Sequence, residues 1–222
     1  MNYQKQLDEL LENKDLLGKK VLVHSCCAPC SSYVIESLRR YFALTIFYYN
    51  PNISDISEYD KRAAEQKRLI REMDIRNYVC QDAHNYPVDF MEGLYEPERF
   101  FEIAEGLENC AEGGERCLKC YELRLRETAM IAKKLNYDYY VTTLTISPLK
   151  SSEKLNEIGR KVGEEIGIPF LPSDFKKKEG YKRSIELSAE YELYRQNYCG
   201  CVYSKNAAKK NLQESTKDKW QV

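Results

Sequence analysis

The sequence predicts a three-layer α/β/α protein of Rossmann-like type, in which helices cover both faces of a parallel sheet. Short runs rich in β-branched and aromatic residues alternate with longer segments of helical periodicity. This alternation is typical of parallel strands joined by helical crossovers. A chain of 222 residues is long enough to bury one hydrophobic core, so we expect a single domain over 1–222.

The amino-terminal part is predicted to supply the first two strands. Residues 1–18 have the pattern of an amphipathic helix, and residues 20–25 form a short run typical of a buried strand. Helical periodicity follows over 31–41. Residues 43–49 are predicted as the second strand, which Asn50-Pro51-Asn52 ends.

The middle of the chain departs from a regular alternation. Residues 58–73 are charged and helical, and a third strand is predicted over 77–81. The segment 84–120 contains two prolines and the run Glu112-Gly113-Gly114-Glu115, so we expect a helical insertion with a loop that delivers Cys117.

The carboxyl-terminal part returns to the alternating pattern. A helix is predicted over 121–135, a strand over 138–143 and a helix over 152–166, which Gly167 and Pro169 end. The polar segment 213–222 is predicted to be a flexible tail.

Charge and hydropathy restrict the class of protein. The net charge of −1 provides no overall basic field for nucleic acid. No stretch approaches the roughly 20 apolar residues of a membrane span, and the amino terminus lacks a signal-peptide pattern. We therefore expect a cytoplasmic protein, where clustered cysteines serve metal or redox chemistry because thiols stay reduced.

Seven of the nine cysteines lie in three tight clusters, and such bunching indicates a metal ion, an iron–sulfur cluster or a redox disulfide. The first cluster is Cys26, Cys27 and Cys30, the second is Cys117 and Cys120, and the third is Cys199 and Cys201. Cys80 and Cys110 are isolated, so we expect neither to be a ligand.

The first cluster follows a predicted strand and opens a predicted helix. Ligands bind at the carboxyl ends of strands in open α/β sheets, and a helix amino terminus favours a thiolate. Cys27-Ala-Pro-Cys30 also has the spacing of a thioredoxin-type redox pair, so both metal and redox chemistry remain open.

The other two clusters leave further alternatives. Cys117 and Cys120 can chelate one metal, but a single pair does not complete a four-ligand site unless the first cluster joins it. Cys199-Gly200-Cys201 can form a strained, reducible disulfide or supply further ligands, and we favour the disulfide.

The two histidines are too few for a zinc-finger site. We expect His24 to pack in the core and His84 to lie on a surface loop. Lysine runs such as 176–178 are predicted to be solvated surfaces.

Five motifs occur in one order along the chain, and together they resemble the QueH family of epoxyqueuosine reductases. They are His24-x-Cys26-Cys27-Ala28-Pro29-Cys30, Gly114-x-Arg116-Cys117-x-x-Cys120-Tyr121-x-x-Arg124-Leu125, Thr143-Leu144-Thr145-Ile146-Ser147-Pro148-x-Lys150, Asp174-Phe175-x-Lys177 and Leu193-Tyr194-Arg195-Gln196-Asn197-Tyr198-Cys199-Gly200-Cys201.

The resemblance implies a HUP-type fold, similar to adenine nucleotide α-hydrolases, and the last step of queuosine biosynthesis. In that step the epoxide of epoxyqueuosine, at the wobble position of a tRNA anticodon, is reduced to an alkene. The resemblance further implies a [4Fe–4S] cluster, either alone or with an adjacent iron, and no cobalamin. The partners are then the modified tRNA and an external electron donor.

The resemblance also implies roles for individual residues. The expected metal ligands are Cys26, Cys27, Cys117 and Cys120. Cys199 and Cys201 are expected to form a redox-active disulfide, and Cys30 to take part in catalysis or to join a separate iron. Candidate substrate contacts are Tyr121, Arg124, Lys150, Lys177 and Arg195.

Three other classes of protein share some of these features. A thiol–disulfide oxidoreductase would use Cys27 and Cys30 as its redox pair, and a zinc-stabilised RNA-binding module would bind zinc without catalysis. An ATP-dependent tRNA-thiolation enzyme would need a glycine-rich loop after the first strand, where this chain is rich in cysteine.

Overall fold

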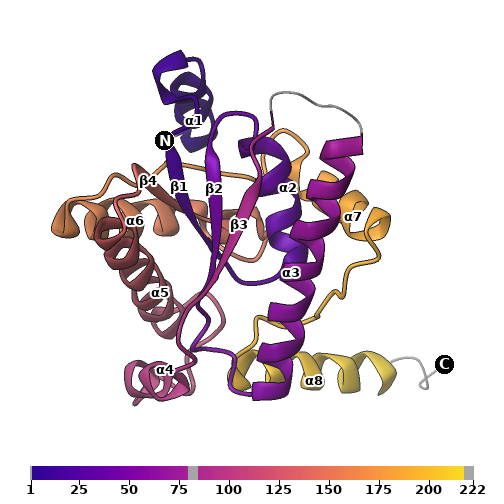
Figure 1. Cartoon of the computed structure of the whole chain (residues 1–222). Coiled ribbons are helices and arrows are strands. Elements are labelled where there is room, and N and C mark those ends of the chain that lie inside the picture. The colour runs from indigo at the N-terminus through magenta and orange to yellow at the C-terminus, as the bar shows by residue number, and fades with distance from the viewer. Residues whose placement is uncertain (1, 80–84, 218–222) are drawn as a thin grey trace.

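A computed structural model describes residues 2–79 and 85–217 and has a parallel four-stranded sheet with helices on both faces (Figure 1). The strands are β1 Lys20–Ser25, β2 Ala43–Tyr48, β3 Val88–Glu92 and β4 Tyr139–Thr142, in the order β3-β2-β1-β4. All three pairings are parallel. The predicted fold class, a three-layer α/β/α protein, is confirmed.

The side chains of the central strand β1 point alternately to two hydrophobic cores. Val21 and Val23 belong to the core beneath α2 Ala28–Leu38, α3 Ile56–Val79 and α7 Gly180–Glu190. Leu22 belongs to the core beneath α5 Glu115–Lys134 and α6 Ser152–Ile166. Because successive side chains of a strand point to opposite faces, the fully apolar run Val21–Val23 requires helices on both faces, as Figure 1 shows.

The remaining helices lie near the two ends of the sheet (Figure 1). Helix α1 Tyr3–Leu11 and the short 3-10 helix η1 Lys14–Leu16 precede β1 at the amino ends of the strands. Helices α4 Pro97–Ala104 and α8 Val202–Lys217 lie at the carboxyl ends, and η2 Thr143–Ile146 follows β4 directly. We call this end of the sheet the carboxyl edge.

The starts of two helices follow from local sequence. Thr142 ends β4 and accepts a hydrogen bond from Leu144 N at 3.1 Å, which begins η2. Ser151 caps α6 in the same way, and Gly167 ends that helix in the left-handed region at φ 79°.

The prediction of a third strand over 77–81 is wrong for the residues that the structure describes. Residues 77–79 belong to α3, which continues because Leu69, Ile70 and Met73 keep facing the core at helical spacing. The third strand is β3, whose one partner among the described strands is β2, at the edge of the sheet. Cys80 and His84, together with their predicted places, lie outside the described residues.

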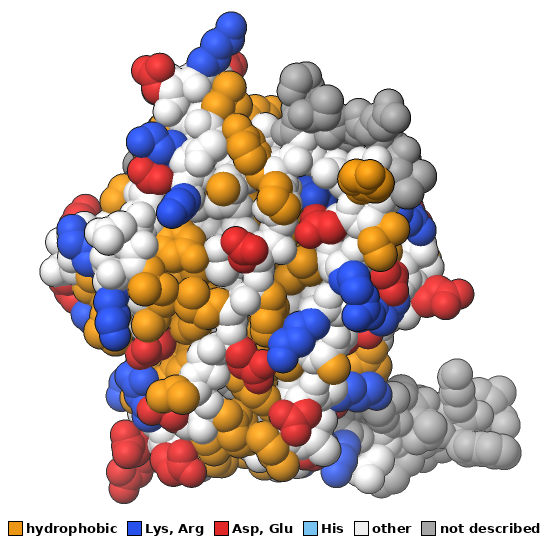
Figure 2. Space-filling model, viewed as in Figure 1, with side chains coloured by type: hydrophobic (Ala, Val, Ile, Leu, Met, Phe, Trp, Pro, Cys, Tyr) orange, Lys and Arg blue, Asp and Glu red, His pale blue; other side chains and the backbone are white. Residues whose placement is uncertain are grey.

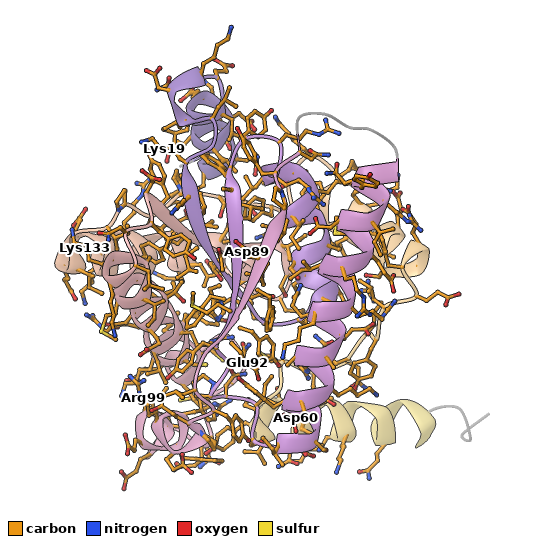
Figure 3. All side chains as sticks on the ribbon, viewed as in Figure 1. Lys19, Asp60, Asp89, Glu92, Arg99 and Lys133 are labelled. Atoms are coloured by element: carbon orange, nitrogen blue, oxygen red, sulfur yellow. The ribbon has the colours of Figure 1, made fainter. Side chains whose placement is uncertain are left out.

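The exposed side chains of the edge strand are acidic. Asp89 and Glu92 lie along β3 in Figure 3, and Glu92 forms an ion pair with Lys67 of α3 at 2.7 Å. Charged side chains discourage an edge strand from pairing with another chain. At the carboxyl terminus, α8 extends to Lys217, within the segment 213–222 that was predicted as a tail.

Positive and negative side chains are interspersed on the face shown in Figure 2, in keeping with the net charge of −1. No helix among the described residues combines the length and apolar character that crossing a membrane requires.

Candidate metal and redox site

The thiols of Cys26, Cys27 and Cys30 form a compact group, the thiol triad, at the carboxyl edge. All three sulfur atoms lie within 4.8 Å of one another, and Cys26 Sγ is 3.7 Å from Cys27 Sγ. Cys27 is the residue that precedes α2, and Pro29 lies in the first turn of that helix. The triad is therefore built by a single strand-to-helix turn.

The three thiols of the triad differ in their acidity. Hydrogen bonds from Cys26 and then Cys30 hold the pKa of Cys27 well below its usual value. The same contacts raise the pKa of Cys30 well above its usual value, with Cys26 as the larger cause. Cys27 is therefore the thiolate of the group, and a thiolate is the form that binds metals.

Four further cysteines line one small cavity of about 20 Å³, and we call them the thiol quartet: Cys117, Cys120, Cys199 and Cys201. Cys117 and Cys120 lie in the first turns of α5, one turn apart on the same side of the helix. The Gly113 N–H donates to Cys117 Sγ at 3.3 Å, and the Ser204 N–H donates to Cys201 Sγ at 3.4 Å.

Burial favours the protonated form of the thiols on α5 when no metal is bound. It raises the pKa of Cys120 to about 12 and also raises the pKa of Cys117. All eight cysteines in the described part of the chain are free, so the predicted disulfide between Cys199 and Cys201 is not supported.

Helix α3 holds the segment that brings Cys199 into the quartet. Arg68 Nη2 donates to the Tyr191 carbonyl at 2.9 Å, and Glu65 Oε1 accepts from Tyr194 N at 2.7 Å. Arg62 Nη1 donates to the Cys199 carbonyl at 3.1 Å. The quartet therefore depends on contacts between segments far apart in the chain.

Gly200 makes the turn between Cys199 and Cys201. Its φ of 125° is rarely adopted by other residues, and an added Cβ would lie 2.8 Å from Ile53 Cγ1. Gly200 therefore permits close packing against the loop after β2.

A larger cavity of about 590 Å³ lies beside both thiol groups, within the range of about 300–1,000 Å³ typical of small-molecule sites. It is lined by the triad, by Lys150 and Arg195, and by Cys199. Cys199 lines the small cavity as well, so it connects the two spaces.

Lys150 carries positive charge into this cavity. Its pKa is raised above the usual value, mainly by electrostatic attraction to Cys199 and also to Tyr121 and Cys26. Burial acts in the opposite direction but is the weaker effect. Arg195 is exposed, and its Nη1 donates to Ser188 Oγ at 3.0 Å.

The structure separates the five predicted substrate contacts. Lys150 and Arg195 line the large cavity, whereas Tyr121 and Arg124 are buried and line the small one. Lys177 is exposed and lines neither of these two cavities.

His24 packs as the sequence predicts. It is fully buried, with Nδ1 at 2.9 Å from Thr142 Oγ1 and Nε2 at 3.2 Å from the Tyr49 carbonyl. Burial, followed by the charge of Arg124, lowers the pKa of His24 to about 3, so the ring stays neutral.

Sequence reasoning missed the role of α3 in assembling the site. Glu58, Arg62 and Glu65 recur at intervals of three to four residues, so they lie on one face of the helix. This helical face of alternating charge is the pattern in the sequence that could have indicated the role of α3. It indicates that the helix packs against a polar segment, but it does not identify that segment.

The fold and the site define a parallel α/β protein that gathers cysteine thiols beside a ligand-sized cavity at the carboxyl edge of its sheet. The family model described as "Epoxyqueuosine reductase QueH" matches residues 21–207, and the chain belongs to this family.

The similarity to curated members extends over most of the chain. An epoxyqueuosine reductase QueH from Staphylococcus epidermidis is 39% identical over 92% of this chain and 84% of its own length. One from Streptococcus pyogenes serotype M1 is 37% identical over 98% and 84%. One from Thermotoga maritima is 34% identical over 83% and 89%.

Proposed function

We propose that this protein reduces the epoxide of epoxyqueuosine in tRNA to the alkene of queuosine. Two electrons and two protons enter the reaction, both epoxide C–O bonds break, and the oxygen leaves as water. Membership of the family supports this assignment. The structural observation that supports it most is the position of Cys199, which lines both the small cavity of the quartet and the larger cavity beside the triad.

The quartet has the donors that an iron–sulfur cluster uses. Four cysteine thiolates are the common ligand set of a [4Fe–4S] cluster, and all four line the same cavity. The buried Arg124 in the wall of this cavity has unpaired guanidinium nitrogens, as an anionic occupant would require. We therefore assign the cluster to Cys117, Cys120, Cys199 and Cys201. When bound, it would supply electrons one at a time.

This assignment divides the cysteines differently from the ligand set expected from the sequence. That set joined Cys26 and Cys27 to Cys117 and Cys120. We propose Cys199 and Cys201 as the partners of Cys117 and Cys120 because these four line one cavity. The set expected from the sequence stays the alternative proposal, since Cys117 also packs against the hydrophobic cluster that contains Cys26 and Cys27. With the quartet as the ligand set, the triad remains available for a separate metal ion, with Cys27 as its thiolate and Cys30 as a further ligand.

Lys150 and Arg195 are the proposed substrate contacts in the larger cavity. A fixed positive charge beside the reacting atoms stabilises negative charge that develops on the epoxide oxygen as the C–O bonds break. We assign this role to Lys150, and we assign contacts with tRNA phosphates to Arg195, which lies at the exposed rim. Binding of tRNA should therefore weaken as the salt concentration rises.

Anaerobic purification followed by a turnover assay tests this function. The protein should contain iron and acid-labile sulfide, and with dithionite it should convert epoxyqueuosine-tRNA to queuosine-tRNA without added cobalamin. The matched control is the same preparation after a chelator has removed the metal. Failure of the fully metallated protein to convert the substrate would contradict the proposal.

The same preparation separates the alternative classes. A thiol–disulfide oxidoreductase predicts a colourless protein with a titratable disulfide, and a zinc-stabilised RNA-binding module predicts bound zinc without turnover. Neither is favoured, because family membership supports the reductase. The expected cytoplasmic location and the identity of the electron donor stay predictions to be tested in the cell.

A further inference from the structure

The larger cavity changes character between its interior and its mouth. Lining residues that are buried, such as Cys27 and Ser184, lie deeper in it, whereas lining residues that are exposed lie at the mouth. Leu149 is 73% exposed and Tyr181 is 37% exposed, and Arg195 is exposed as well. The mouth therefore presents an apolar side chain, an aromatic ring and a guanidinium group to solvent.

Two tyrosines among the described residues line this cavity, and their rings have different surroundings. The ring of Tyr198 faces two cations, since its centre lies 5.1 Å from Arg62 Cζ and 5.8 Å from Lys205 Nζ. The ring of Tyr181 has no such aromatic or cationic neighbour in the described part of the chain. Tyr181 therefore offers a ring face to a ligand, whereas the ring of Tyr198 is already in contact with charged groups.

Close packing fixes the backbone that carries Tyr181. Gly180 begins α7, and an added Cβ there would lie 2.0 Å from the Phe175 carbonyl oxygen and 2.4 Å from Tyr33 Cε1. One turn further along the helix, Ser184 Oγ donates to the Tyr181 carbonyl at 2.6 Å. Because the backbone is fixed and a tyrosine side chain has few rotatable bonds, little conformational freedom is lost when a ligand stacks on the ring.

We propose that Tyr181 stacks on the nucleobase of the wobble nucleotide that enters the larger cavity. Enzymes that act on a base take it out of its stack and hold it against aromatic and apolar side chains, and unpaired bases of RNA loops bind aromatic rings in the same way. Tyr181 and Leu149 supply such side chains at the mouth, while Lys150 lines the same cavity for the reacting group. This inference rests on the proposed function, because that function supplies the nucleotide.

Binding of an unmodified anticodon stem-loop RNA, measured by fluorescence anisotropy, tests this contact without turnover. The RNA carries either guanine or an abasic residue at the wobble position. Tyr181→Ala should weaken binding of the guanine RNA by about tenfold, the typical effect of removing one contact between a base and an aromatic ring. The abasic RNA should bind wild type and Tyr181→Ala equally. Tyr181→Phe keeps the ring and should bind both RNAs as wild type does.

Ile185→Ala is the matched control, because Ile185 lies one turn further along α7 and is exposed but lines neither of the two cavities. Tyr181→Leu replaces Tyr181→Ala if that variant does not fold, since it keeps an apolar side chain without the ring and should show most of the same loss. Turnover adds a second readout. Tyr181→Ala should raise KM for epoxyqueuosine-tRNA and leave kcat nearly unchanged, because the ring binds the base and not the reacting bonds.

The outcomes separate stacking on the base from a purely structural role. Equal weakening of the guanine and abasic RNAs by Tyr181→Ala would overturn the proposal, because the ring would then act on the fold and not on the base. So would an unchanged affinity for the guanine RNA, or a wild-type protein that binds both RNAs equally. A wild-type protein that shows the expected dependence on the base but does not convert epoxyqueuosine-tRNA would instead refute the proposed function, so the two failures are distinguishable.

Discussion

The two thiol groups of this protein are assembled in opposite ways. The triad lies within one turn, where β1 ends and α2 begins, so neighbouring residues determine its geometry. The quartet joins the start of α5 to the segment before α8, and that segment is held in place by α3. A local group requires only correct secondary structure, whereas a group assembled from distant segments requires the tertiary fold to be complete.

This difference also affects how the two groups respond to protons. The triad stabilises one thiolate internally, because two neighbouring thiols bond to Cys27. The thiols of the quartet on α5 are buried and hold their protons more tightly, so metal binding there must displace them. We therefore expect that disrupting the triad and disrupting the quartet will change the metal content of the protein in different ways.

Removal of one thiol from each group is expected to have the largest effect. Cys120→Ala should abolish epoxide reduction and lower acid-labile sulfide to a small fraction of the wild-type amount, because a cluster ligand is lost. Cys27→Ala should retain the sulfide while losing activity. Iron and sulfide analysis with the turnover assay checks both variants.

Cys110→Ala is the control for these variants, since Cys110 lines neither of the two cavities. Equal loss of sulfide from Cys27→Ala and Cys120→Ala would indicate a single cluster shared by the two groups. That result would restore the ligand set expected from the sequence.

A substitution at Gly200 is expected to weaken the quartet while leaving the triad intact. Gly200→Ala places a Cβ against Ile53 at a φ of 125°, so it should cost about 1–3 kcal/mol of unfolding free energy and reduce sulfide content. Denaturant titration and sulfide analysis measure the two effects.

Gly113→Ala is the matched control for Gly200→Ala. Gly113 also has a positive φ, of 86°, but an added Cβ there meets nothing within 4 Å. Its cost should be about 1 kcal/mol, from backbone strain alone. A Gly200→Ala variant no less stable than Gly113→Ala would show that the packing against Ile53 is unimportant.

The smallest expected effect concerns Glu65, which anchors the segment before Cys199. The hydrogen bond from Arg68 is the main cause that lowers the pKa of Glu65, and the hydrogen bond from the Tyr194 N–H lowers it further. Burial acts in the opposite direction. A carboxyl whose pKa is lower in the folded state stabilises the fold above its unfolded pKa, and this contribution is lost as the pH falls through the folded value. Glu65→Gln should therefore be about 1 kcal/mol less stable than wild type at pH 7.

The difference between Glu65→Gln and wild type should shrink below the unfolded pKa of Glu65, near 4.5. Urea unfolding at pH 7 and at a pH below the folded pKa checks this dependence. Glu72→Gln is the control, because Glu72 also bonds Arg68 but touches no backbone of the anchored segment. A difference for Glu65→Gln that stays constant with pH would contradict the role of the carboxylate.

The sequence by itself determined the features that depend on neighbouring residues. Strand and helix periodicity predicted β1, β2, β4 and the main helices, and the position of Cys26, Cys27 and Cys30 after a strand predicted thiols at the carboxyl edge. The five ordered motifs also indicated the family that the comparisons confirm.

Only the tertiary structure decided which distant residues share a cavity. Cys117, Cys120, Cys199 and Cys201 line one small cavity, and Arg124 lies in its wall. The third strand is Val88–Glu92 and not the predicted segment 77–81. The physical reason is that periodicity and capping act over a few residues. The packing of α3 against the segment before α8, in contrast, depends on long-range contacts that no local pattern encodes.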